Sequence, residues 1–168
     1  MRSTPETKKQ QLIADLTEAR SEVIQAALAL PLDAQEVPFL GVWSAHDIVA
    51  HLIGWDYANL EAIEAIRAGR LPAFYAAYDR DWRTFNAGLV ARYEQPTLEQ
   101  TVSEARASKR ALVEALEALP AEDLTRDYGI RWGRRERVTI PMLLGVEARD
   151  ERKHANQIRA FASRTQEK

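Results

Sequence analysis

Apolar residues recur three and four positions apart along most of the chain, which is the spacing of an amphipathic helix. Residues 4–29 follow this spacing, with Pro5 suited to a first helical turn and Pro31 just beyond the end. The apolar positions of this segment are Leu12, Ile13, Leu16, Val23, Ile24, Ala27 and Leu28. They predict a first helix over residues 4–29.

Capping residues mark the ends of a second and a last helix. Ser44 suits an N-cap, Asp47 three residues later completes a weak capping box, and Gly69 closes the segment. Much further along, Thr139 is another N-cap residue before a helical pattern that runs to about Ser163. We therefore predict one helix after Ser44 and a last helix after Thr139.

The segment between these two helices is predicted to be helical in two pieces. Pro96 separates the pieces, and residues 97–100 form a capping box for the second piece, which stops at Pro120. The connection through residues 71–81 and the segment 121–138 are predicted to be long loops.

Four long helices joined by polar connections indicate an all-α fold, a four-helix bundle. No internal repeat, low-complexity tract or shift in composition divides the chain, so we expect residues 1–168 to form a single domain. The long connection before the third helix leaves the order of the helices in space open.

Composition narrows the partners that we expect. The 168 residues include no cysteine, so any metal must be held by histidine or carboxylate side chains. The 23 basic and 25 acidic residues give a formal net charge of −2, with no polybasic tail, and we expect no nucleic-acid partner. No apolar run approaches the roughly 20 residues that span a bilayer, so we expect a cytoplasmic protein without a membrane partner.

The last predicted helix has polar residues where its apolar stripe should be. The stripe follows the 3-4 spacing of a bundle seam through Ile140, Leu143, Glu147, Asp150, His154, Gln157 and Phe161. A buried carboxylate must be hydrogen-bonded, ion-paired, metal-bound or in a water-filled pocket. One interpretation is a buried network with nearby arginines, either Arg149 and Arg152 or those of residues 131–137.

A metal site is the more specific interpretation of these polar residues. Asp150 and His154 are four residues apart and so lie one above the other on a helix face. A third ligand must come from another helix, and His51 suits this role better than His46, which lies in a first turn. Two histidines and one carboxylate leave coordination positions open for water or substrate. Asp47, one turn before His51, either orients its ring or caps the helix.

Two motifs carry a family resemblance. The stretch VWSAHDIVAHLIGWD contains Trp43 and Ser44 at the opening of a helix and His51 with Leu52 further on. The later stretch ARDERKHANQIRAF places Asp150, His154 and Gln157 in an H-x-x-x-H-x-x-Q-type pattern. Together with the segment YDRDWRTFNAGLVARY, they resemble the DinB-like four-helix-bundle superfamily, in particular its DfsB/ClbS-type branch.

The resemblance implies a divalent-metal site built from one histidine of the second helix and a histidine pair of the last helix. In this chain Asp150 stands where many relatives have histidine, although the related mycothiol-dependent maleylpyruvate isomerases have a glutamate there. The implied metal is zinc, nickel or iron, and a donor set with a carboxylate leaves its identity and occupancy open. The ClbS-type branch also implies protection against a reactive metabolite by hydrolysis, without an established metal.

Two functions stay open. The first is a metal-dependent hydrolase or thiol-dependent transferase acting on a small electrophilic molecule, in detoxification or stress resistance, with Glu147 as general base or as the partner of a buried cation. The second is a non-catalytic bundle that binds or sequesters a small molecule without a metal. Five aromatic residues are candidates for a pocket above the metal: Trp43, Tyr75, Tyr78, Trp82 and Trp132. We also expect a homodimer, the commonest assembly.

Overall fold

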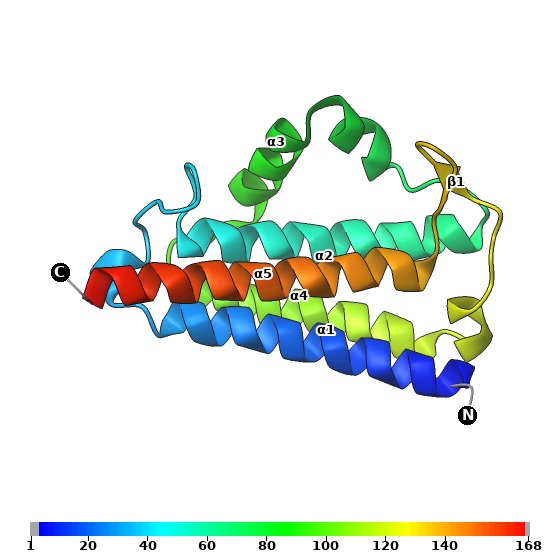
Figure 1. Cartoon of the computed structure of the whole chain (residues 1–168), viewed down its shortest axis with the longest axis horizontal. Helices are drawn as coiled ribbons and strands as arrows, with labels where there is room; N and C mark the ends of the chain where they lie inside the picture. Colours follow the sequence, from blue (N-terminus) through cyan, green and yellow to red (C-terminus); the bar gives the residue numbers. More distant parts are fainter. Residues whose placement is uncertain (1–3, 167–168) are drawn as a thin grey trace.

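The computed structural model describes residues 4–166 (Figure 1). Its α-helices are α1 (Pro5–Leu28), α2 (Ala45–Arg67), α3 (Phe74–Tyr93), α4 (Leu98–Ala118) and α5 (Ile140–Gln166). Short 3-10 turns follow α1 and α4, at η1 (Leu32–Ala34) and η2 (Ala121–Leu124). Strands β1 (Arg131–Trp132) and β2 (Glu136–Arg137) pair antiparallel in a small hairpin before α5.

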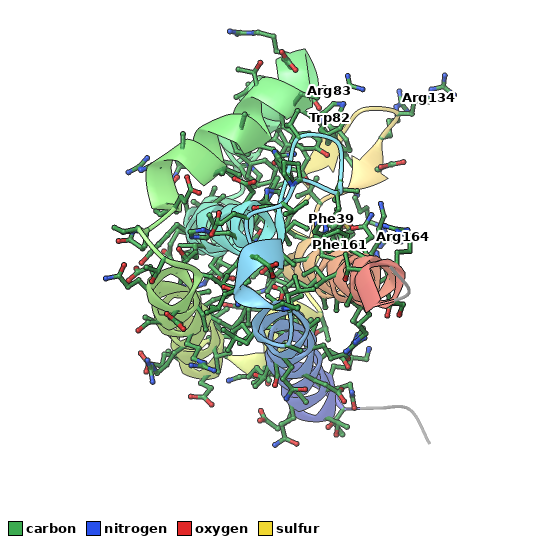
Figure 2. All side chains as sticks on the ribbon, turned by 90° about the vertical axis from the view of Figure 1, so that its left-hand side faces the viewer. Phe39, Trp82, Arg83, Arg134, Phe161 and Arg164 are labelled. Atoms are coloured by element: carbon green, nitrogen blue, oxygen red, sulfur yellow. The ribbon has the colours of Figure 1, made fainter. Side chains whose placement is uncertain are left out.

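Four helices form the bundle, and α3 lies outside it against α2 (Figure 1, Figure 2). Within the bundle α1 runs parallel to α5, and α2 runs parallel to α4, because contacts advance in the same direction along both partners. The pairs that show this are Arg20–Glu151 and Glu22–Arg159, then His46–Thr101 and Asp56–Lys109. The predicted all-α four-helix bundle is confirmed, and α3 is the crossover that lets α2 and α4 point the same way.

The caps predicted from the sequence hold the helix ends. Ser44 Oγ accepts the Asp47 N–H at 3.2 Å, and the Asp47 carboxylate accepts the Ser44 N–H at 2.8 Å, so the capping box of α2 is complete. Thr97 Oγ accepts the Gln100 N–H at 3.3 Å at the start of α4. Each of these hydrogen bonds satisfies a donor that the first turn of a helix leaves free.

The connection after α2 is shorter than predicted. We expected a loop through residue 81, but α3 begins at Phe74 and is interrupted only at Asp81, whose φ of −160° and ψ of 91° are not helical. Its carboxylate accepts the N–H groups of Arg83 and Thr84 at 3.1 and 3.2 Å, so it caps the second half of α3. Asp81 therefore separates α3 into two helical halves.

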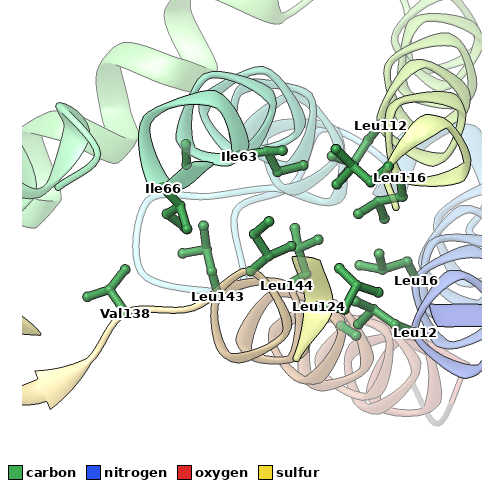
Figure 3. Close-up of a cluster of buried hydrophobic side chains, with 14 of the residues drawn as sticks. Leu12, Leu16, Ile63, Ile66, Leu112, Leu116, Leu124, Val138, Leu143 and Leu144 are labelled. Carbon is green, nitrogen blue, oxygen red and sulfur yellow. The ribbon is translucent and has the colours of Figure 1, made fainter. Parts of the chain in front are cut away.

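A layer of buried charge divides the core into two apolar clusters. Figure 3 shows one cluster, to which every bundle helix contributes. Its labelled members include Leu12 and Leu16, Ile63 and Ile66, Leu112 and Leu116, and Leu143 and Leu144. Burial of each such side chain contributes about 1.5–3 kcal/mol. The second cluster surrounds Val23, Ile48 and Ile158 nearer the other end of the bundle.

Within residues 4–166 no helix combines the length and the apolar character that a bilayer crossing requires.

Candidate metal centre and cavity

The polar seam predicted on the last helix faces inward in α5. Glu147 and His154 are 7% and 6% exposed, and Asp150 is half-buried beside them. Helix α2 packs against this seam and places His51, which is 3% exposed, beside His154. The structure therefore brings the three predicted ligands, His51, Asp150 and His154, to one place.

The three side chains converge closely enough to share an ion. Each offers one ligand atom, and these atoms all lie within 4.8 Å of one another. Asp150 Oδ2 is 3.3 Å from His154 Nε2, and the rings of His51 and His154 are 5.7 Å apart between centroids. His51 Nδ1 is buried without a hydrogen-bond partner among residues 4–166. Two imidazoles and one carboxylate fit a divalent metal with open coordination positions.

The protonation states also suit metal binding. Nδ1 of His154 lies 2.8 Å from Gln157 Oε1, and a hydrogen bond to this oxygen fixes the orientation of the ring, with Nε2 on the side of Asp150. Burial, and then the nearby His154, lower the pKa of His51 to about 3, so this ring is neutral at pH 7. Burial alone would raise the pKa of Asp150, but its interactions with the two histidines outweigh burial and lower it.

A cavity of about 1100 Å³ opens above the three candidate ligands. All five aromatic residues predicted to line a pocket are in its wall, and Trp55 and Phe74 join them. These side chains come from the loop before α2, from α2 and α3, and from the β1–β2 hairpin. Trp132 Nε1 donates to Asp79 Oδ2 at 2.7 Å and so joins the hairpin to α3 across the cavity. A cavity of this size and lining accepts a drug-sized apolar molecule.

Beneath the cavity, two cations and three carboxylates form a buried network. Arg20 donates to Asp56 at 2.8 Å and to Glu151 at 3.0 Å. Lys109 Nζ lies 2.7 Å from Asp56, 2.5 Å from Glu147 and 2.9 Å from Glu151. With all five groups ionised the network carries one excess negative charge, so one carboxylate is expected to hold a proton.

Burial favours Glu147 as the carboxylate that takes this proton. Burial raises its pKa well above the usual value against the opposing effect of Lys109, whereas Arg20 and Lys109 overcome burial and lower the pKa of Asp56 to about 2. Asn59 contacts Glu147, and the Asn59 Oδ1 atom is buried without a partner among residues 4–166. Turning the amide over would let this oxygen accept the Glu147 proton.

The cations that pair with the buried carboxylates are not those proposed from the sequence. Arg149 is exposed, Arg152 lies against acidic residues of α1, and the arginines of residues 131–137 lie on the hairpin surface. The buried partners are instead Arg20 and Lys109, from helices distant in sequence. The hypothesis of a buried charge network is correct, but its arginine partners were wrong.

His46 does not join the centre, as its place in a first turn predicts. Its Nδ1 lies 2.7 Å from Glu36 Oε1, and its Nε2 lies 2.7 Å from Thr101 Oγ1. Asp47 is used in the cap of α2 with Ser44. Of the two roles considered for Asp47, the structure therefore supports capping.

Fold and site together define a helical-bundle protein with a group of possible metal ligands beside an aromatic cavity. The sequence matches the family model of the DinB superfamily over residues 15–158. This match covers most of the chain, so the chain belongs to the DinB superfamily. No curated protein sequence matched the chain.

Solved structures share this fold at low sequence identity. The sibling lethal factor precursor DfsB is 14% identical, with a TM-score of 0.76 over 94% of this chain and 96% of that chain. The colibactin self-resistance protein ClbS, solved in complex with double-stranded DNA, is 18% identical, with a TM-score of 0.70 over 89% and 92%. An uncharacterised protein from Clostridium difficile 630 is 15% identical, with a TM-score of 0.74 over 91% and 94%. The predicted resemblance to DfsB and ClbS is confirmed.

The prediction that excluded a nucleic-acid partner is wrong, because ClbS, a protein of this fold, is bound to double-stranded DNA in its structure. The prediction relied on net charge, which averages over the whole surface. In this chain the exposed arginines Arg131, Arg134, Arg135 and Arg137 gather on the β1–β2 hairpin. A local cluster of this kind attracts phosphate even when the total charge is negative.

Sequence reasoning missed Arg20, Asp56 and Lys109. A signal was present, because Arg20 interrupts the apolar stripe of α1 between Leu16 and Val23, as the carboxylates interrupt the stripe of α5. A charge on the buried face of a helix requires an opposite charge on a facing helix. A comparison of the charged positions that interrupt the apolar stripes of different helices would have suggested the buried network.

Proposed function

We propose that this chain is a resistance or detoxification protein that uses a divalent metal to modify a small apolar molecule, as a hydrolase or a thiol-dependent transferase. The convergence of His51, Asp150 and His154 at the wall of the aromatic cavity carries the proposal. The fold shared with ClbS, a colibactin self-resistance protein, and with DfsB supports a resistance role.

His51, Asp150 and His154 would hold the metal, and a bound divalent ion lowers the pKa of a coordinated water and polarises an electrophile. The aromatic wall would bind the apolar body of the substrate and exclude water from it. Glu147 lines the same cavity, and burial raises the pKa of its carboxyl group, which favours the protonated form. A protonated acid suits a proton donor, so we assign Glu147 the role of general acid in place of the general base predicted from the sequence.

Metal content tests this proposal. The purified wild-type protein is expected to contain metal at the three-residue centre, and the His154→Ala variant is expected to lose it. The control variant Asn156→Ala changes an exposed residue of the same helix and is expected to retain the metal. The measurement is elemental analysis combined with thermal unfolding, since a metal at 100 times its Kd stabilises the folded state by about 2.7 kcal/mol.

A His154→Ala variant with undiminished metal content would overturn the ligand assignment. If chelator, zinc and nickel all leave the unfolding temperature unchanged, the metal proposal fails. The alternative function then remains, a metal-free bundle that sequesters its ligand in the cavity.

A second candidate function is contact with duplex DNA, which the arginine hairpin favours. Arg134 and Arg135 are exposed at its turn and have no carboxylate within 4.0 Å among residues 4–166. Figure 2 places Arg134 on the same side of the bundle as Arg83 of α3. Exposed arginines free of carboxylate partners are suited to phosphate contacts.

Binding of a duplex oligonucleotide across salt concentrations tests the DNA contact. Replacing Arg134 and Arg135 with alanine is expected to weaken binding and to reduce the slope of log K against log salt by about 1.8, since each lost phosphate contact removes about 0.9. Arg164→Ala, at the end of α5, is the matched control. Equal slopes for the hairpin variant and the control, or no binding by the wild-type chain, would exclude the contact.

A further inference from the structure

A second group of metal-type side chains lies at one end of the bundle, and none of its members lines the cavity. Glu36 comes from the connection between α1 and α2, His46 from the first turn of α2, and Glu94 from the end of α3. One ligand atom from each lies within 4.8 Å of those from the other two. Figure 1 shows the α1–α2 and α3–α4 connections at the end where α5 finishes.

His46 is held in one orientation. Its side chain is 2% exposed, and its Nε2 atom lies 2.7 Å from the hydroxyl of Thr101. That hydroxyl also accepts the backbone N–H of Gln95 at 3.0 Å, next to Glu94 in the chain. A histidine ligand fixed through its far nitrogen is typical of metal sites, since the second hydrogen bond sets both ring orientation and tautomer. The Nδ1 atom is thereby directed at the two carboxylates.

The two glutamates have the imidazole of His46 beside them but no lysine or arginine among residues 4–166. Glu36 Oε1 is 2.7 Å and Glu94 Oε1 is 3.8 Å from His46 Nδ1. Neither carboxylate has a lysine or arginine within 4.0 Å among residues 4–166, and a single Nδ1 proton satisfies only Glu36. Two carboxylates that meet at one imidazole nitrogen create a negative potential that attracts a cation.

The distances suit a small divalent ion. Ligand atoms each about 2.1 Å from a tetrahedral zinc ion lie about 3.4 Å from one another. The observed separations of 2.7 and 3.8 Å from Nδ1 lie on either side of that value, and both carboxylates are exposed and free to adjust.

We propose that Glu36, His46 and Glu94 form a second divalent-cation site, separate from His51, Asp150 and His154. One nitrogen and two carboxylate oxygens suit zinc or a similar first-row ion, with water completing its coordination. An ion here joins the α1–α2 connection to the junction of α3 and α4. The same connection continues into residues 40–43, which line the cavity, so the ion also fixes one side of the cavity mouth.

The test counts zinc sites in the full-length chain with the first centre disabled. His154→Ala protein is titrated with zinc against a chromophoric chelator, and the side-chain nitrogen signals of His46 are followed by NMR. One equivalent is expected, with a shift at His46 Nδ1. Adding Glu36→Gln and Glu94→Gln is expected to weaken zinc binding at least tenfold, whereas Glu99→Gln, an exposed glutamate in the first turn of α4, leaves it unchanged.

The two metal proposals fail separately in this design. If zinc does not change the chemical shifts of the His46 side-chain nitrogens in either wild-type or His154→Ala protein, the second site is refuted whatever the first centre binds. Zinc binding retained after both glutamate substitutions refutes it as well. If wild-type protein binds one equivalent and that ion shifts His46, the second site is supported while the proposed cavity centre fails.

Discussion

Lys109 places one ammonium group against Asp56, Glu147 and Glu151, at 2.7, 2.5 and 2.9 Å. Replacing it with methionine leaves those buried charges without one of their two cations. We expect Lys109→Met to lower the free energy of unfolding by about 3–5 kcal/mol, the usual cost of breaking a buried ion pair. Urea denaturation of this variant measures the loss.

Lys153→Met is the matched control, since Lys153 is exposed on α5 and its substitution is expected to change stability by less than about 0.5 kcal/mol. Equal stability of the two variants would mean that the network does not depend on its lysine.

Glu147 makes the stability of the protein depend on pH. Its folded-state pKa is raised by burial, so the folded chain keeps this proton at pH values where the unfolded chain has released it. As pH rises above about 4.5, the wild-type chain therefore loses stability relative to Glu147→Gln, by up to about 1.4 kcal/mol per pH unit. Denaturation of both proteins between pH 5 and 8 checks this, with Glu99→Gln as a control for a surface glutamate.

A stability difference between wild type and Glu147→Gln that stays constant over this range would show that Glu147 is ionised in the folded state. The proton-donor role would then fail with it.

At the residue scale, the burial of a side chain was easier to predict from the sequence than the identity of its interaction partner. The 3-4 spacing of α5 correctly predicted that Glu147 and His154 face inward, because spacing alone sets the face of a helix. It did not predict that Lys109 is the counter-ion of Glu147, because the facing residue depends on which helices are neighbours and in what register. His51 was found because histidine is scarce: the chain has 3.

Among the elements, α3 depends on one glycine of α2 for its position. A Cβ atom built on Gly54 would meet Leu89 Cβ at 2.7 Å, too close for the two helices to keep their separation. We expect Gly54→Ala to displace α3 and to weaken binding of an apolar fluorescent probe in the cavity, although alanine favours the helical backbone by about 1 kcal/mol. Fluorescence titration measures the probe affinity.

Gly88→Ala on α3 is the matched control, since no atom lies within 4 Å of the Cβ it would add. This substitution is expected to gain helix stability and keep probe affinity. A Gly54→Ala variant with wild-type affinity would show that α3 tolerates the displacement.

Helix ends were predictable where a side chain caps them. Ser44 and Thr97 are local signals, because the hydrogen-bond acceptor and the free N–H lie three residues apart. The start of α3 was not predicted, because Ala73 at its N-cap position makes no side-chain hydrogen bond. Its attachment to α2 comes from tertiary contacts such as Gly54 with Leu89, which no local pattern contains.

At the scale of the whole molecule, the number of bundle helices was predictable and their directions were not. Four helices with apolar stripes must pack together to bury those stripes. Because the connections are long, the stripes alone do not determine that α1 packs beside α5 and α2 beside α4. We expect a homodimer, and light scattering after size-exclusion chromatography should report the mass of two chains, whereas a single-chain mass at micromolar concentration would contradict the prediction.

The crossover position of α3 separates the part of the molecule that maintains the fold from the part that meets a ligand. Only Tyr75, Asn86 and Val90 of this helix are buried, and of these Tyr75 alone belongs to the two apolar clusters of the core. The remaining residues of α3 can therefore change with little effect on the bundle core or the charge layer. Exchange of this helix between family members offers a direct way to evolve, or to engineer, a different cavity wall on a constant bundle.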